Sequence, residues 1–332
     1  ARSRSGQPGV ARRTAVIVAT SGSTGEPKGV ELSAAALTYS ARASLARAGA
    51  RPGERWLACL PASHVAGLQV LVRSLVGGTE PAAAASATAA SVAAAADAGC
   101  AHVSVVPTQL VRLLGEDGGA ALARYRCVLV GGAAAGAAIL DEARRAGISA
   151  VTTYGMSETC GGCVYDGVPL DGVTVRADDG GRLRISGPVL MDGYYRRPGL
   201  TAAALSGGEF VTSDLGSVDP GGRVLVRGRA DDVINTGGHK VVPGEVAAVL
   251  ATCPGVREVV VVGRRDPEWG ERVTAVVVPA DPADPPDLEL LRTHVRARLP
   301  RYACPSEVEL TEAIPLLPSG KPDLAALRVA RT

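Results

Sequence analysis

Apolar strand-like runs alternate with helix-like segments along the first half of the chain. β-branched and apolar residues predict buried strands at 14–19, 55–60, 101–106, 127–130 and 150–153. Helical patterns separate these runs, starting with a helix that Ser33 caps and that extends from 34 to about 48. Because the strands end in glycine-rich or polar turns, the alternation predicts an α/β fold with a mainly parallel sheet.

The pattern changes after the last of these strands. Residues 169–228 are rich in Gly, Pro and Asp and alternate like strands, for example at 182–186. From 244 onward a helix, two strands, a helix and a strand follow one another, which predicts a compact α+β unit. We therefore predict a large N-terminal domain, 1–228, and a small C-terminal domain, 229–332.

Composition narrows the possible functions. The chain has 332 residues and a net charge of +2, which is too even to favour nucleic acid or an anionic membrane as a partner. No apolar run approaches the roughly 18 residues of a membrane span, and the polar start at 1–13 does not resemble a secretory signal. Seven scattered cysteines favour a reducing cytoplasm over a disulfide framework, and we expect Cys160 and Cys163 to be packing residues.

A dense glycine and hydroxyl loop follows the first predicted strand. It contains Thr20, Ser21, Gly22, Ser23, Thr24, Gly25 and Lys28. Glycines let backbone N–H groups approach an anion, and the hydroxyls and the ammonium add further donors, so the loop predicts a polyphosphate site. It is not a Walker A loop, because no Ser or Thr follows the lysine. A solvated Ser/Gly turn is the simpler alternative.

Lysine occurs at only three positions, Lys28, Lys240 and Lys321, among 35 basic residues. Each lysine lies within two residues of a glycine. Since lysine presents a compact charge on a flexible stem, whereas arginine presents a planar fork, these three positions are predicted to need an ammonium group.

The loop resembles the phosphate-binding signature of the acyl-adenylate-forming superfamily, which includes acyl-CoA synthetases, adenylation domains and luciferases. Four further segments are similar to motifs of that superfamily and stand in the same order, namely 154–158, 212–216, 228–232 and 315–321. The resemblance implies an N-terminal domain that binds ATP and the acyl group, and a mobile C-terminal lid that contains a catalytic lysine. It also implies ATP, Mg²⁺ and coenzyme A as partners of the chain.

The resemblance assigns roles to individual residues. Lys321, Glu158 and His64 are expected in catalysis, with Glu158 also holding the metal. ATP phosphates are expected at Thr20, Ser21, Gly22, Ser23, Thr24, Gly25, Lys28 and Ser157. Adenine and ribose are expected at Gly131, Gly132, Ala133, Tyr154, Gly155, Asp214 and Arg229. The hinge is expected at Asp231, and Gly238 and Lys240 are expected to approach coenzyme A.

Three segments, 64–74, 106–114 and 161–170, resemble the branch of o-succinylbenzoate–CoA ligases that act in menaquinone synthesis. This likeness implies a small carboxylic acid with a second, unreacting carboxylate, which needs a partner when it is buried. The acyl candidates are His64, Arg73, Gln109 and Arg112, and Arg112 is the favoured partner of the second carboxylate.

Other functions stay open at this point. The chain could be another aryl- or fatty-acyl-CoA ligase, or a non-catalytic nucleotide-binding module. An amino-acid adenylation domain is disfavoured, because residues 61–64 contain no acidic residue to hold an amine. The sequence does not determine the oligomeric state, for which a homodimer is one expectation.

Overall fold

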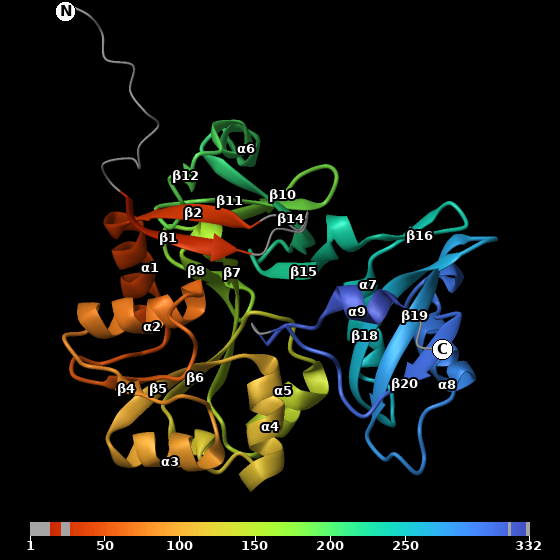
Figure 1. Ribbon diagram of the computed structural model, residues 1–332, viewed down its shortest axis with the longest axis horizontal. Helices are drawn as coiled ribbons and strands as arrows, with labels where there is room; N and C mark the ends of the chain where they lie inside the picture. The colour runs from red at the N-terminus through yellow and green to blue at the C-terminus, as the bar shows by residue number, and fades with distance from the viewer. Residues whose placement is uncertain (1–13, 21–26, 318–319, 330–332) are drawn as a thin grey trace, which may run out of the picture.

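The computed structural model describes residues 14–20, 27–317 and 320–329 of the chain. Figure 1 shows a large N-terminal part beside a small C-terminal part that contains β16 to β20. The predicted α/β class is confirmed, since parallel strands alternate with helices through the first half of the chain. No helix of the described ranges is both long and apolar enough to cross a membrane.

A seven-stranded sheet forms the centre of the large part, in the order β4-β3-β5-β6-β7-β8-β9. The first five strands in this order are parallel, as the alternation predicted, and β8 and β9 continue the sheet in antiparallel pairing. The strands are β3 (Arg55–Ala58), β4 (Ala82–Ala83), β5 (Cys100–Val105), β6 (Cys127–Val130), β7 (Ala150–Met156), β8 (Gly161–Tyr165) and β9 (Val168–Pro169).

Helices cover both faces of this sheet. Val103, Val105 and Val128 point to one face and pack with α3, α4 and α5, whereas Trp56 and Leu129 point to the other face and pack with α1 and α2. This division follows from the alternation of side chains along a strand. The helical segments are α1 (Ala34–Arg47), α2 (Val65–Val76), α3 (Ala89–Asp97), α4 (Pro107–Asp117), η1 (Leu122–Arg124), α5 (Ala137–Arg145) and η2 (Ser157–Thr159).

Several element boundaries differ from the sequence prediction. Ser33 caps α1 as expected, since its Oγ accepts a hydrogen bond from the Ala36 N–H at 3.1 Å. The segment 61–67 predicts a turn that opens a helix at Leu68, but helix α2 begins three residues earlier, at Val65, because the extended His64 acts as its N-cap. Strand β7 continues to Met156 because it pairs with β8, a partner that the sequence did not predict. Tyr154 and Gly155 therefore lie within the strand.

Two antiparallel sheets complete the large part. The first has the order β1-β2-β12 and the second the order β10-β11-β14-β13, with β15 also paired to β14. Their strands are β1 (Thr14–Thr20), β2 (Lys28–Ser33), β12 (Gly193–Tyr194), β10 (Thr174–Ala177), β11 (Arg182–Ser186), β13 (Leu205–Ser206), β14 (Glu209–Val218) and β15 (Val224–Arg229), and helix α6 (Pro198–Ala204) lies before β13. The β-rich interpretation of 169–228 is thus confirmed.

The small part has its own five-stranded sheet and its own buried cluster. The sheet has the order β17-β16-β19-β18, and β20 pairs with β19 in parallel. Its elements are η3 (Ala230–Asp232), β16 (Ile234–Thr236), β17 (His239–Val241), α7 (Pro243–Leu250), β18 (Val256–Asp266), β19 (Gly270–Pro279), α8 (Leu288–Arg296), η4 (Arg301–Ala303), β20 (Glu307–Leu310) and α9 (Leu324–Arg328). The domain boundary after Gly228 stays a prediction.

Candidate active site

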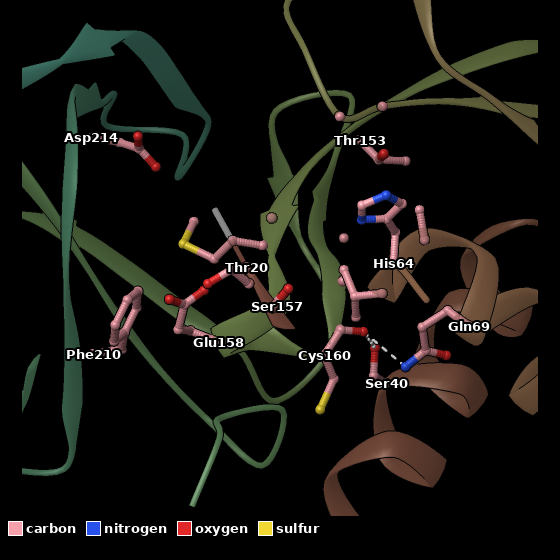
Figure 2. Close-up of a pocket in the computed structure, with 18 of the residues that line it drawn as sticks. Thr20, Ser40, His64, Gln69, Thr153, Ser157, Glu158, Cys160, Phe210 and Asp214 are labelled. Carbon is pink, nitrogen blue, oxygen red and sulfur yellow. Dashed lines mark hydrogen bonds between the residues drawn. The ribbon is translucent and has the colours of Figure 1, made fainter. Parts of the chain in front are cut away.

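A cavity of about 560 Å³ opens where the parallel strands end and the antiparallel sheets approach them. Thr20, at the end of β1, Val106, after β5, and Gly131, after β6, all line it. Figure 2 shows Asp214 on one side of this cavity and His64 and Gln69 on the other. Ligands of open α/β sheets gather at this edge of the sheet, so the cavity is the candidate active site.

The middle of the cavity contains the residues predicted to hold phosphates and metal. Thr20, Lys28, Ser157 and Glu158 all line it. The predicted residues Ser21, Gly22, Ser23, Thr24 and Gly25 lie outside the described residues. Glu158 Oε1 accepts a hydrogen bond from the Tyr194 hydroxyl at 2.8 Å, and the Tyr194 ring lies 5.6 Å from Lys28 Nζ. Tyr194 therefore contacts both a candidate metal ligand and a candidate phosphate ligand.

Several residues predicted to bind adenine and ribose lie close to Asp214. The Tyr154 hydroxyl donates to Asp214 Oδ2 at 2.7 Å, and Arg229 Nη1 lies 3.4 Å from Asp214 Oδ1. Gly131, Gly132, Gly155, Asp214 and Arg229 line the cavity. Tyr154 and Ala133 are not among the residues that line it, so the stacking of adenine on Tyr154 stays a prediction.

A close approach of backbone explains the glycine at position 131. A Cβ there would lie 2.1 Å from Thr153 Oγ1, well inside van der Waals contact. Gly132 has a φ of +86°, a conformation that favours glycine. This pair lets the chain turn away from β6 and leaves its backbone exposed along the cavity.

Lys321 belongs to the small part and lines the cavity of the large part. The neighbouring Gly320 accepts a hydrogen bond from the Thr108 hydroxyl at 3.5 Å, which links the two parts. Lys321 is exposed at the cavity, but protein atoms around its ammonium group partly desolvate it. This desolvation and the charge of Arg229 lower the pKa of Lys321, while Asp214 and Glu158 oppose the shift.

The far side of the cavity contains a buried arginine. Arg73 is only 4% exposed and lines the cavity together with His64 and Gln69. Its Nε donates to the Gln69 carbonyl at 3.1 Å, Nη1 to Ser44 Oγ at 3.0 Å and Nη2 to Ser104 Oγ at 3.1 Å. Within the described part of the chain no Asp or Glu forms an ion pair with it, and burial lowers its pKa. A buried cation without a counter-ion is a strong candidate partner for an anionic ligand.

The structure places two of the predicted acyl residues outside the cavity lining. Arg112, the favoured partner of the second carboxylate, does not line the cavity. Its side chain is 48% exposed, donates to the Ala87 carbonyl at 2.6 Å and pairs with Glu116, because it lies on the side of α4 that faces α3. Gln109 is also outside the cavity lining, since its side-chain oxygen accepts from the Val106 N–H at 3.0 Å.

Residues predicted near the hinge and coenzyme A lie away from the cavity lining. Asp231 Oδ2 accepts a hydrogen bond from Arg229 Nη2 at 3.0 Å, just after the predicted domain boundary. Gly238 lies in the turn between β16 and β17 and Lys240 lies within β17, and both are exposed on the surface of the small part. Their roles in domain motion and coenzyme A binding stay predictions.

Sequence reasoning missed several polar residues that line the cavity, above all Ser44, Ser104 and Tyr194. Ser40 and Ser44 are four residues apart on an alanine-rich helix, and this polar stripe was the available signal.

Cys160 and Cys163 are free and fully buried, and burial raises the pKa of each thiol to about 12. The packing interpretation of this pair therefore agrees with the structure.

Comparison with known proteins defines the class of protein. Residues 3–195 match the family of AMP-binding enzymes, and residues 245–321 match the C-terminal domain of AMP-binding enzymes. Because the first match covers more than half of the chain, the chain belongs to the AMP-binding enzyme family.

The similar proteins are more specific. A probable 2-succinylbenzoate–CoA ligase of Mycobacterium tuberculosis is 46% identical over 322 residues, which cover 94% of this chain and 83% of that protein. The solved o-succinylbenzoate CoA synthetase (MenE) of Bacillus subtilis, in complex with the acyl-adenylate OSB-AMP, aligns with a TM-score of 0.82 and 30% identity, over 96% of this chain and 69% of that one.

The same fold also occurs in a protein with a different product. The amide bond synthetase McbA of Marinactinospora thermotolerans aligns with a TM-score of 0.85 and 32% identity, over 95% of this chain and 69% of that one. The fold alone therefore does not choose the acid or the acceptor, and the choice depends on residues in the cavity.

Proposed function

We propose that the chain is an AMP-forming acid–thiol ligase that adenylates o-succinylbenzoate with ATP and transfers the acyl group to coenzyme A, in menaquinone biosynthesis. The observation on which this proposal rests is the composition of one cavity. Lys28, Glu158 and Lys321 line it, and so does Arg73, which has no acidic partner among the described residues. Such a cavity offers positive charge to a triphosphate and, separately, to an acid with two carboxylates.

We place ATP on the side of Asp214. Asp214 is 8% exposed, and its carboxylate can accept hydrogen bonds from the ribose hydroxyls, while Arg229 beside it balances its charge. Backbone at Gly131 and Gly132 lies open to the base. Thr20, Lys28 and Ser157 then supply donors to the phosphates.

The residues present fit a magnesium ion that the nucleotide brings with it. Within the described residues no group of three or more His, Cys, Asp or Glu could hold a metal, which suits a metal held by one carboxylate, phosphates and water. Glu158 is that carboxylate, and Tyr194 orients it. When bound, the ion neutralises charge on the phosphates during their displacement.

Lys321 is assigned to the first step. An oxygen of the acid's carboxylate forms a bond to the α-phosphorus, the bond from that phosphorus to the bridging oxygen breaks, and pyrophosphate leaves. Negative charge develops on the phosphoryl oxygens during this exchange, and a cation already in place stabilises the transition state more than the substrate. The position of Lys321 in the cavity suits this role.

Arg73, and not Arg112, is assigned to the carboxylate that stays unreacted. Arg73 is buried, lines the cavity and has no acidic partner among the described residues, so an incoming carboxylate would relieve an uncompensated charge. His64 lines the same cavity, on the side opposite Asp214 in Figure 2, and can contact the body of the acid.

The second step requires the thiol of coenzyme A to attack the acyl carbonyl and release AMP. Lys321 lies in the cavity in this structure, which corresponds to the arrangement needed for the first step. We propose that the small domain, 229–332, turns about Asp231 to bring Gly238 and Lys240 toward the cavity, since two steps with different partners benefit from two arrangements. A cytoplasmic location and a homodimer are further expectations for this enzyme.

Turnover of o-succinylbenzoate with ATP, Mg²⁺ and coenzyme A is the direct test. We expect AMP, pyrophosphate and the coenzyme A thioester to form in equal amounts. A panel of aryl and fatty acids in ATP–pyrophosphate exchange separates this ligase from its relatives. ATP binding without AMP formation from any acid would contradict the enzymatic assignment.

A further inference from the structure

Three buried side chains from three elements form a continuous stack beside the cavity. The guanidinium carbon of Arg73, on α2, lies 4.1 Å from the ring centroid of Trp56, on β3. The Trp56 ring in turn lies 4.8 Å from the ring of His102, on β5, with an angle of 24° between the planes. Trp56 and His102 are 0% exposed and Arg73 is 4% exposed.

Trp56 substitutes for the acidic partner that a buried arginine normally needs. The face of an indole attracts a cation, and the attraction is strongest where water is excluded. An aspartate or glutamate at this place would also stabilise Arg73, but it would neutralise the charge and compete with an acidic ligand. The indole face stabilises the guanidinium and leaves its remaining N–H groups to oxygen acceptors.

Packing alone does not account for an indole at this position. The Trp56 Nε1–H is buried and has no hydrogen-bond partner in the described part of the chain. Buried tryptophans usually find such a partner, and an unmet donor destabilises the folded state. An aliphatic side chain would fill the space without this unmet donor, so the function of Trp56 lies in its ring face.

The other face of Trp56 is supported by a neutral ring. His102 Nε2 lies 2.9 Å from Glu54 Oε2, and Glu54 Oε1 accepts a hydrogen bond from Arg126 Nε at 2.9 Å. Burial lowers the pKa of His102, and Arg126 and Arg73 lower it further, against the opposing effect of Glu54. The imidazole therefore stays neutral near pH 7 and adds no second cation to the stack.

We propose that Trp56 is a positioning residue that determines specificity: it holds Arg73 charged and oriented, so that the cavity prefers an acid with a second carboxylate over a monocarboxylic acid of the same shape. This inference deepens the proposed function and rests on it. Trp56 does not line the cavity, so it acts on the substrate only through Arg73.

The test compares two acids in ATP–pyrophosphate exchange. One is o-succinylbenzoate, and the other is 4-oxo-4-phenylbutanoate, which has the same skeleton without the carboxylate on the ring. The measured quantity is the ratio of kcat/KM for the first acid to that for the second. We expect Trp56→Leu to lower this ratio about tenfold, the effect of losing a desolvated cation–π contact, through a higher KM for the diacid. Trp56→Phe, which keeps an aromatic face, is expected to lower it less.

A double-mutant cycle shows whether Trp56 acts through Arg73. Arg73→Met should abolish most of the preference for the diacid, and adding Trp56→Leu to that variant should leave the ratio unchanged. Leu122→Ala is the control, because Leu122 is fully buried in a different cluster. It should lower the melting temperature without changing the ratio.

Several results would overturn the inference. One is that Trp56→Leu, like Leu122→Ala, lowers kcat/KM by the same factor for both acids, so that the ratio is unchanged. Another is that Trp56→Leu lowers the ratio as strongly in the Arg73→Met background as in the wild type. If Trp56→Leu fails to fold, an unchanged ratio in Trp56→Phe overturns it instead. A wild type that does not adenylate o-succinylbenzoate overturns the proposed function together with this inference, whereas failure of the Trp56 role alone leaves wild-type turnover intact.

Discussion

The Tyr194 hydroxyl donates a hydrogen bond to Glu158 Oε1 at 2.8 Å, and this bond joins strand β12 to the short helix η2 that follows β7. Tyr194 is 6% exposed and is fixed by the pairing of β12 with β2, the strand that begins with Lys28. Its hydroxyl therefore orients the candidate metal ligand, while its ring lies beside the lysine expected to meet the phosphates.

Removing this hydroxyl should weaken the metal site. In Tyr194→Phe the ring stays beside Lys28, but Glu158 loses the group that orients it, and outer hydrogen bonds of this kind change metal affinity about 10- to 100-fold. We expect a higher Mg²⁺ requirement at saturating ATP. Binding of Mn²⁺ in the presence of a non-hydrolysable ATP analogue, followed by electron paramagnetic resonance, measures the same loss without turnover. Unchanged Mn²⁺ affinity would show that Tyr194 only packs.

Replacing Lys321 should separate the two half-reactions. Lys321→Ala removes a cation from the cavity, and loss of one electrostatic stabiliser of a transition state costs about 100- to 1,000-fold in rate. Adenylation should fall by this amount, whereas thioester formation from supplied acyl-adenylate should be nearly unchanged. ATP–pyrophosphate exchange measures the first step and coenzyme A consumption the second. Equal loss of both steps would contradict the assignment.

The charge of Lys321 should also limit adenylation at alkaline pH. Lys321 acts as a cation, so adenylation is present below its pKa and is lost as the pH rises through it. Desolvation and Arg229 lower this pKa against the opposing charges of Asp214 and Glu158, so the loss should begin below the pH at which an ordinary lysine titrates. In Lys321→Arg the limit should move to higher pH, because a guanidinium stays protonated. A limit at the same pH in both proteins would assign it to another group.

Two glycines offer a matched pair for stability. Gly131→Ala places a Cβ 2.1 Å from Thr153 Oγ1, and overpacking of this kind costs about 1–3 kcal/mol. Gly115, within α4, has no atom within 4 Å of its would-be Cβ, so Gly115→Ala should stabilise the fold by about 0.5–1 kcal/mol. Denaturant unfolding measures both changes, and AMP affinity should fall only in Gly131→Ala. Equal stability of the two variants would be evidence against the close contact.

Local pattern was sufficient to predict elements whose partners lie close in sequence. The Ser33 cap and the strand Cys127–Val130 are correct because a capping hydroxyl and a run of β-branched residues act over a few residues. The extension of β7 to Met156 was missed because it depends on the antiparallel partner β8, whose pairing is a tertiary contact. The start of α2 at Val65 was missed because the conformation of His64, not its side-chain chemistry, decides it.

The sequence by itself determined the family and the motifs at the strand ends, since fixed spacings of Gly, Ser, Lys, Glu and Asp limit the ligand chemistry. It could not choose between Arg73 and Arg112. Both are arginines on amphipathic helices beside the sheet, and only the rotation of each helix decides which guanidinium reaches the cavity. The tertiary structure buries Arg73 against Trp56 and leaves Arg112 paired with Glu116 at the surface. That choice is tertiary because the burial of Arg73 and its lack of an acidic partner among the described residues depend on side chains from β3, β5 and α1, which are distant in the chain.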